Sequence, residues 1–221
     1  MKAGCRVTVL ISGNGSNLQT LIDQQARGEL PIRLQAVISN RDDAHGLQRA
    51  TDARIPSLAL SHKQYGSRDE YDAALAQAID SHGTDLLVLA GFMRILTPDF
   101  VLRYQGRMLN IHPSLLPAYR GLHTHRRVLE QGDSQHGCSV HFVTPDLDAG
   151  PIVLQARVPV GQQDTEETLA ARVQAEEHRI YPLAVRWFAQ GRLALRNGAV
   201  HLDGSPLPAP LVLGQGDPLP H

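Results

Sequence analysis

The sequence predicts an α/β protein with a mostly parallel central sheet flanked by helices. Apolar, often β-branched runs at 6–11, 32–39 and 85–90 indicate buried strands, and segments with apolar residues at helical spacing lie between them. Polar or glycine-containing segments follow these runs directly, where ligands bind in open α/β sheets. With 221 residues, 42% of them hydrophobic and 19% charged, the chain can bury one proper core.

Composition and charge exclude several classes of protein. The formal net charge of −1 gives no bulk attraction for nucleic acid or anionic membranes. Two cysteines, Cys5 and Cys138, do not make a disulfide framework, and no signal peptide precedes Val7. Hydrophobic runs such as 86–90 are far too short to span a bilayer. We therefore expect a cytoplasmic enzyme with neither a nucleic-acid nor a membrane partner.

The first expected strand, over 6–11, leads into Ser12-Gly-Asn-Gly-Ser-Asn17 and then into a helix. A strand, a glycine-rich turn and a helix together present backbone N–H groups and a helix dipole to an anion. Gly13 and Gly15 match part of the dinucleotide fingerprint, but Leu18 stands at its third glycine position. The segment is therefore either a phosphate cradle or a plain tight turn.

The second strand, over 32–39, ends in Asn40-Arg-Asp-Asp43. These acidic residues could bind a ribose or could cap the next helix, expected over 44–53. After a short strand over 55–60, a capping box at Ser67-Arg-Asp-Glu70 begins a helix that runs to about residue 81.

The segment 85–90 is the strongest strand prediction in the chain. Gly91-Phe-Met-Arg-Ile-Leu96 follows it and could be core or could wall a pocket for a flat heterocycle. Thr97 and Pro98 then provide the cap and the first position of a short helix.

Residues 108–121 carry the strongest candidate site. Asn110 and His112 are two positions apart on an expected strand, so their side chains leave the same face. Pro113 ends that strand because proline cannot donate to the ladder, and Pro117 stiffens the loop beyond it. The sequence thus predicts an amide and an imidazole side by side at a strand end.

The C-terminal half is predicted to be built from helices and hairpins. The expected elements are a helix over 123–131, strands over 136–144 and 152–158 that could pair as a hairpin-like arm, a long helix from 164 that Pro182 would kink without ending, and a hairpin over 193–202 with a type I′ turn at Asn197-Gly198.

Two motifs carry a resemblance to a known family. Asn110-Ile-His-Pro-Ser-Leu-Leu-Pro117, with Asp148-Ala-Gly-Pro151 downstream, resembles the signature of the folate-dependent formyltransferases. Within that family, Ile11-Ser-Gly-Asn-Gly-Ser-Asn-Leu18 resembles the glycinamide ribonucleotide formyltransferases. The resemblance covers the chain from Val7 to Asp203.

The resemblance implies a single Rossmann-like formyltransferase domain over 1–203, with the ribonucleotide phosphate site in its N-terminal half and the folate site in its C-terminal half. Composition indicates an irregular, proline-rich tail over 204–221. The implied reaction, in de novo purine biosynthesis, transfers the formyl group of 10-formyltetrahydrofolate, a co-substrate, to the amine of 5-phosphoribosylglycinamide. The implied partners are these two small molecules, no metal is implied, and the chain is expected to be a monomer or homodimer.

The resemblance implies that Asn110, His112 and Asp148 are catalytic. Formyl transfer passes through a tetrahedral intermediate with an oxyanion, which an Asn amide donor can stabilise. His112 can donate to the same oxygen and then move a proton, for which it should be protonated near neutral pH. A nearby carboxylate favours that form, and Asp148 is the candidate.

The resemblance also implies binding residues. For the ribonucleotide they are Gly15, Ser16, Asn17, Gln174 and Glu177. For the folate they are Arg68, Met93, Arg94, Ile95, Leu96, Asn110, Thr144, Pro145, Asp146 and Leu147. From the residues alone, Arg68 and Glu177 could equally be solvated charges on helices. Arg120 could touch the substrate phosphate, the glutamate tail or nothing.

Several alternatives remain open. A metal site would draw on His112, His123, His125, His136 and His141. The two histidines of His123-x-His125 lack a cysteine or carboxylate companion at a usual ligand spacing, so scattered surface histidines explain the set better.

Among enzymes, a nicotinamide dehydrogenase is disfavoured by Leu18. Formyltetrahydrofolate hydrolase shares the three polar residues but resembles a longer chain without this glycine loop. Methionyl-tRNA formyltransferase carries a further nucleic-acid-binding domain, for which this chain is expected to end too early. A non-enzymatic folate-binding module would need no His–Asp pair.

Overall fold

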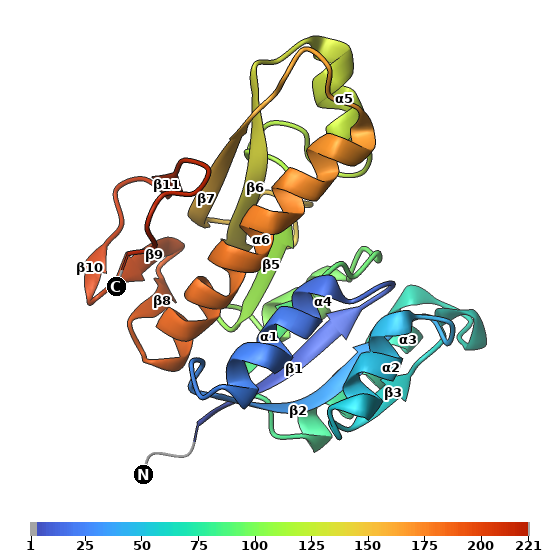
Figure 1. The fold of residues 1–221 in the computed structure, drawn as a ribbon. Helices are drawn as coiled ribbons and strands as arrows, with labels where there is room; N and C mark the ends of the chain where they lie inside the picture. The colour runs from blue at the N-terminus through green and yellow to red at the C-terminus, as the bar shows by residue number, and fades with distance from the viewer. Residues whose placement is uncertain (1–3, 221) are drawn as a thin grey trace. The chain divides into compact units, whose positions relative to one another are not determined.

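Figure 1 shows the computed structural model of the chain, which describes residues 4–220. The chain divides into two compact units, one ending at Asn110 and the other beginning at Ile111. The division falls inside strand β5 (Met108–His112). The single formyltransferase domain over 1–203 stays a prediction, and each unit is described here by itself.

The first unit is a parallel sheet with helices, which confirms the predicted fold class. Its strands are β1 (Cys5–Ile11), β2 (Ile32–Ser39), β3 (Ser57–Ala59), β4 (Leu86–Leu89) and the start of β5, in the order β3-β2-β1-β4-β5. Its helices are α1 (Ser16–Ala26), α2 (His45–Asp52), α3 (Arg68–Ser81) and α4 (Pro98–Arg103), with a 3-10 turn η1 (His62–Gln64). β1 is central, so its last five residues are all buried.

The predicted helix starts in this unit are confirmed. Thr97 caps α4 and Pro98 occupies its first position. Ser67 Oγ accepts a hydrogen bond from Glu70 N at 3.1 Å at the start of α3. The Glu70 carboxylate accepts from Gly66 N at 2.9 Å instead of from the N–H of Ser67, so only the Ser67 half of the predicted capping box is confirmed.

The second unit combines an antiparallel pair with a long helix. β6 (Gln135–Phe142) pairs antiparallel with β7 (Ile152–Pro159), as predicted for the hairpin-like arm. The helices are α5 (Thr124–Gln131) and α6 (Glu166–Ala189), and α6 packs along β6 and β7 (Figure 1). Pro182 lies inside α6, which confirms the prediction that the helix continues past it; the kink expected there stays a prediction.

A small second sheet follows α6. It consists of β8 (Leu193–Arg196), β9 (Ala199–Leu202) and β10 (Ser205–Pro206), all antiparallel. Asn197 and Gly198 have φ angles of 51° and 77°, so both central turn residues are left-handed and the predicted type I′ turn is confirmed.

The segment after Asp203 is not irregular throughout, so the predicted irregular tail does not hold for its strands. β11 (Leu211–Leu213) pairs parallel with β7. Gly216 N donates to Glu176 Oε1 at 3.3 Å, and Arg179 donates to the backbone carbonyl of Asp217. Composition could not reveal this segment because β11 has only three residues and gains its hydrogen bonds from a distant strand.

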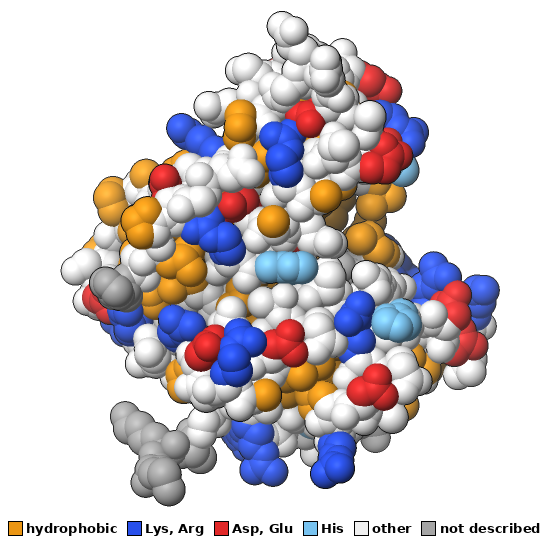
Figure 2. Space-filling view, in the orientation of Figure 1, with side chains coloured by type: hydrophobic (Ala, Val, Ile, Leu, Met, Phe, Trp, Pro, Cys, Tyr) orange, Lys and Arg blue, Asp and Glu red, His pale blue; other side chains and the backbone are white. Residues whose placement is uncertain are grey.

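The surface carries both signs of charge. On the face in Figure 2, basic and acidic side chains are interspersed, in keeping with the net charge of −1. Among residues 4–220, no helix has the length and apolar character needed to cross a membrane.

Candidate functional site

In the second unit, His112 and Asp148 lie together. His112 is buried at the end of β5, and its Nε2 lies 3.0 Å from the carbonyl oxygen of Tyr119. A carbonyl only accepts, so Nε2 carries the proton and donates. The other ring nitrogen, Nδ1, lies 3.4 Å from Asp148 Oδ2, and the Asp148 side chain is only 9% exposed. The imidazole is thus held between a carbonyl and a carboxylate.

Two further groups reach Asp148, and sequence reasoning missed both in this role. Gly121 N donates to Asp148 Oδ2 at 2.8 Å. His141 Nε2 lies 3.9 Å from Asp148 Oδ1, while His141 Nδ1 donates to the carbonyl of Phe142 at 2.8 Å. Burial lowers the pKa of His141, an effect that the Asp148 carboxylate opposes. His141 faces inward on a strand, which sequence spacing alone does not distinguish from an outward position.

Asn110 is the last residue of the first unit and precedes His112 by two positions on β5. Strand alternation directs both side chains to the same side of that strand. Asn110 is half-buried, in contrast to its neighbours Leu109 and Ile111.

In the first unit, the glycine-rich loop forms the start of α1. Gly15 is its N-cap residue with φ 74°, and no side chain caps the helix. A Cβ at Gly15 would lie 2.8 Å from Gly46 Cα, so only glycine fits. Ser16 and Asn17 occupy the first turn of α1. An uncapped helix start of this kind favours an anion.

Arg49 of α2 holds this loop, a contact that sequence reasoning missed. Its Nε donates to the Asn14 carbonyl at 2.8 Å and its Nη2 to Asn14 Oδ1 at 3.1 Å. Its Nη1 donates to Gln19 Oε1 at 3.1 Å. The contact with Asn14 spans 35 residues of sequence, so no local motif signals it.

The predicted folate residues of the first unit lie on the loop after β4 and on α3. Met93 and Ile95 are 66% and 56% exposed, so the interpretation of this loop as core is wrong for both, whereas Leu96 is buried. Met93 N donates to Ser12 Oγ at 2.7 Å. Arg94 and Arg68 differ in surroundings: the Arg94 guanidinium lies 4.8 Å from the centroid of the Tyr71 ring, while Arg68 is exposed at the first position of α3.

The other predicted folate residues, in the second unit, precede Asp148. They are Thr144, Pro145, Asp146 and Leu147, on the loop between β6 and β7. Leu147 is 51% exposed. Thr144 Oγ1 donates to the carbonyl of Asp146 at 3.4 Å, and Ala149 N donates to the same oxygen at 3.3 Å, so this loop is internally bonded.

Gln174 and Glu177 lie on α6. Gln174 is exposed. Glu177 is 8% exposed, so its interpretation as a solvated charge is wrong. A buried carboxylate requires compensating partners, which makes Glu177 a candidate for a specific role.

The histidines are not all at the surface, which corrects the sequence interpretation. His136 and His141 are 1% and 2% exposed because β6 is buried on both of its faces. His136 Nε2 lies 2.9 Å from His125 Nδ1, and burial lowers the pKa of His136 to about 4 and also lowers that of His125. Within residues 4–220, no three His, Cys, Asp or Glu side chains are placed to hold a metal ion.

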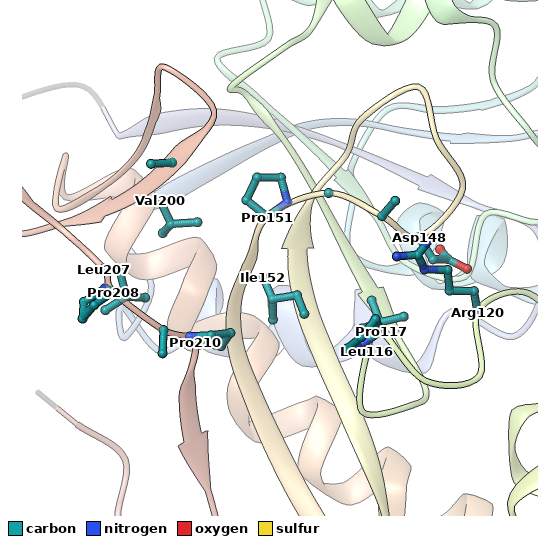
Figure 3. Close-up of a pocket in the computed structure, with 14 residues that line it drawn as sticks. Leu116, Pro117, Arg120, Asp148, Pro151, Ile152, Val200, Leu207, Pro208 and Pro210 are labelled. Atoms are coloured by element: carbon teal, nitrogen blue, oxygen red, sulfur yellow. The ribbon is translucent and has the colours of Figure 1, made fainter.

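A cavity of about 380 Å³ in the second unit reaches Asp148. Its lining comes from residues near Leu116, from 148–152, and from the segments 199–200 and 207–210. Figure 3 shows Arg120 and Asp148 toward one side, and Val200, Leu207, Pro208 and Pro210 toward the other. Most of the lining is apolar, and Arg120 is exposed.

The profile of the formyl transferase family matches residues 5–185. The phosphoribosylglycinamide formyltransferase of Escherichia coli (strain K12) is 55% identical over 202 residues, covering 91% of this chain and 95% of that protein. The phosphoribosylglycinamide formyltransferase of Haemophilus influenzae is 48% identical and covers 92% of this chain and 96% of that protein.

Solved structures agree with these relatives. The phosphoribosylglycinamide formyltransferase of Coxiella burnetii, in complex with CHES, superposes with a TM-score of 0.92 at 52% identity, over 95% of this chain and 99% of that one. Glycinamide ribonucleotide transformylase 1 of Symbiobacterium toebii gives a TM-score of 0.88 at 48% identity, over 91% and 95%. The chain belongs to the formyl transferase family and, within it, to the phosphoribosylglycinamide formyltransferases.

Proposed function

We propose that the protein transfers the formyl group of 10-formyltetrahydrofolate to the amine of 5-phosphoribosylglycinamide in purine biosynthesis. The amine nitrogen attacks the formyl carbon and forms the new C–N bond. The bond from that carbon to N10 of the folate then breaks. The amine loses one proton and N10 gains one, so the products are the N-formyl ribonucleotide and tetrahydrofolate.

Three residues carry the proposed chemistry. The Asn110 amide donates to the oxyanion of the tetrahedral intermediate, an interaction that typically stabilises such a state by ~2.7–4 kcal/mol. We assign to His112 Nε2, whose proton the Tyr119 carbonyl also accepts, a second hydrogen bond to the oxyanion and the transfer of the proton from the attacking amine toward N10. Asp148 orients the ring and accepts from Gly121 N through Oδ2, and we propose that Oδ1, which lies 3.9 Å from His141 Nε2, also holds a relaying water.

The observation that carries this proposal is the pair formed by His112 and Asp148, at 3.4 Å, in a chain whose residues 5–185 match the formyl transferase family. A histidine held on both ring nitrogens keeps one orientation, and proton transfer depends strongly on that orientation.

The proposed ligand sites follow the family resemblance. We assign the ribonucleotide phosphate to Gly15, Ser16 and Asn17, whose backbone begins α1 with no side-chain cap. Gln174 and Glu177 are proposed to bind the remainder of that substrate. The folate is assigned to 93–96, which would line its pterin, and to 144–147; the exposed apolar side chains Met93, Ile95 and Leu147 suit a flat ligand. We place the reaction in the cytoplasm and propose that the protein acts as a monomer or homodimer.

The test is turnover of 10-formyltetrahydrofolate by the purified protein, with and without glycinamide ribonucleotide. Tetrahydrofolate released only in the presence of the ribonucleotide is expected. Equal release without it would identify a hydrolase instead, and folate binding with no release would identify a binding module.

Asp148→Asn supplies the matched test of mechanism. The variant should lower kcat about 100-fold or more, because a general acid–base pair contributes on that order. Asp203→Asn is the control, since Asp203 pairs with Arg192 in the terminal hairpin at 2.7 Å and has no assigned role. Equal kcat values for the two variants would contradict the proposed role of Asp148.

A further inference from the structure

The segment over residues 117–123, here called the strap, is the last part of the connection from β5 to α5, and its backbone reaches both members of the His–Asp pair. The Tyr119 carbonyl accepts from His112 Nε2, and Gly121 N donates to Asp148 Oδ2. Both of these strap residues have positive φ, at 56° for Tyr119 and 79° for Gly121. A tyrosine in this conformation is strained, so other contacts must hold the strap in place.

Arg127 of α5 supplies such contacts. Its Nη1 donates to the carbonyl of Arg120 at 2.7 Å and to that of Leu122 at 3.5 Å. Its guanidinium also lies 5.3 Å from the centroid of the Tyr119 ring. Arg120 stands between the two backbone groups that reach the His–Asp pair, and Leu122 follows Gly121. One side chain therefore contacts the strap at three of its residues, Tyr119, Arg120 and Leu122, on either side of Gly121.

We propose that Arg127 is a positioning residue for formyl transfer, which rests on the function proposed above. It holds the strap so that the Tyr119 carbonyl and Gly121 N–H keep His112 and Asp148 in their reacting orientation. The planar guanidinium suits this role, because it can donate to carbonyls while stacking on an aromatic ring, which an ammonium cannot do equally well.

A second contact holds the strap from elsewhere. The Tyr119 hydroxyl donates to Asp133 Oδ2 at 2.5 Å, so the ring is fixed at its tip as well as on its face. This contact explains why the ring offers a stable surface to Arg127. It also predicts that the effects of changing Tyr119 and Arg127 are coupled.

The adjacent residue provides a matched control. Arg126 lies on the same helix, is 57% exposed at its side chain, and pairs with Glu166 at 3.1 Å. None of its hydrogen bonds or ion pairs within residues 4–220 involves the strap. Arg126→Met and Arg127→Met therefore remove the same charge and the same number of atoms from neighbouring positions, and only the second removes the strap contacts.

The experiment combines steady-state kinetics with NMR of the His112 ring. Arg127→Met should lower kcat about tenfold or more, since small misplacements of reacting groups cost up to 100-fold, while KM for both substrates changes less than about threefold. It should also shift the ring-nitrogen signals of His112. Arg126→Met should leave both unchanged. A folded Arg127→Met protein with the kcat and His112 signals of Arg126→Met would overturn the proposal.

Arg127→Lys decides the matter if Arg127→Met does not fold. Lysine keeps the charge but offers a single donor nitrogen in place of the planar guanidinium, so kcat should lie between that of wild type and the loss of about tenfold expected without the contact. Wild-type kcat with unchanged His112 signals would again overturn the proposal. In a double-mutant cycle with Tyr119→Leu, the two losses should be less than additive. The NMR signals report the His112 ring without any turnover. If the wild-type protein transferred no formyl group, the proposed function would be refuted, but the effect of Arg127 on the His112 ring could still be measured.

Discussion

Gly15→Ala tests the glycine-rich loop most sharply. The added Cβ would lie 2.8 Å from Gly46 Cα, and the residue would have to keep φ at +74°. Gly46 cannot retreat easily. Its N–H donates to the Gly13 carbonyl at 3.0 Å, and its own position is so tight that a Cβ there would lie 2.4 Å from Ile11 Cδ1.

The expected cost has two parts. A left-handed non-glycine residue costs ~1–2 kcal/mol. Overpacking against a backbone atom that cannot move adds ~1–3 kcal/mol. We therefore expect Gly15→Ala to lose ~2–5 kcal/mol of unfolding free energy if the loop keeps its position. The loss is smaller if the loop moves to relieve the close contact.

Urea unfolding and steady-state kinetics measure the two consequences. The midpoint should fall, and KM for glycinamide ribonucleotide should rise at least about tenfold, because the backbone N–H groups at the start of α1 move. Gly13→Ala is the control, since a Cβ there meets nothing within 4 Å. Equal urea midpoints and equal KM values for the two variants would refute the claim that close packing at Gly15 fixes the phosphate-binding loop.

Three other predictions follow from contacts described above. Arg49→Met should raise KM for the ribonucleotide about threefold to tenfold with kcat unchanged, because three hydrogen bonds to Asn14 and Gln19 are lost; an unchanged KM in the same kinetic assay would contradict it. The pKa of His136 is lowered to about 4, so the unfolded chain binds more protons below its ordinary value of ~6.5, and stability should fall as pH drops from there toward 4. In thermal melts at pH 5 and pH 7.5, His136→Asn should reduce the difference in Tm between the two pH values. An equal difference in the wild type and the variant would argue against this assignment. Deleting residues 210–221 removes β11 and the contacts of Glu176 and Arg179, so the urea midpoint should fall, and an unchanged midpoint would show that these contacts contribute little.

Elements signalled by local chemistry were predictable. Thr97 and Pro98 start α4, Asn197-Gly198 turns the last hairpin, and the apolar runs became β1, β2 and β4. In each case the deciding interaction lies within a few residues. Periodicity and turn chemistry report such interactions directly.

Features that depend on distant residues were not predictable. The burial of Glu177 and His136 depends on which faces α6 and β6 present to each other, and the alternation of residues does not specify that. Arg127 contacts a strap in which Tyr119 is left-handed, a conformation that a tyrosine adopts rarely and that its residue type does not predict. The family motif predicted His112 and Asp148, and the structure supplied the backbone groups that hold them.

β11 also determines how the sheet of the second unit ends. Without it, the eight-residue β7 would be the terminal strand, with a row of open N–H and C=O groups able to pair with another chain. β11 covers the middle of that row and is itself only three residues long, with Pro210 immediately before it. A short strand next to proline is a poor template for further pairing. The proline-rich end of the chain thus leaves less of the β7 edge open to pairing with a strand of another chain.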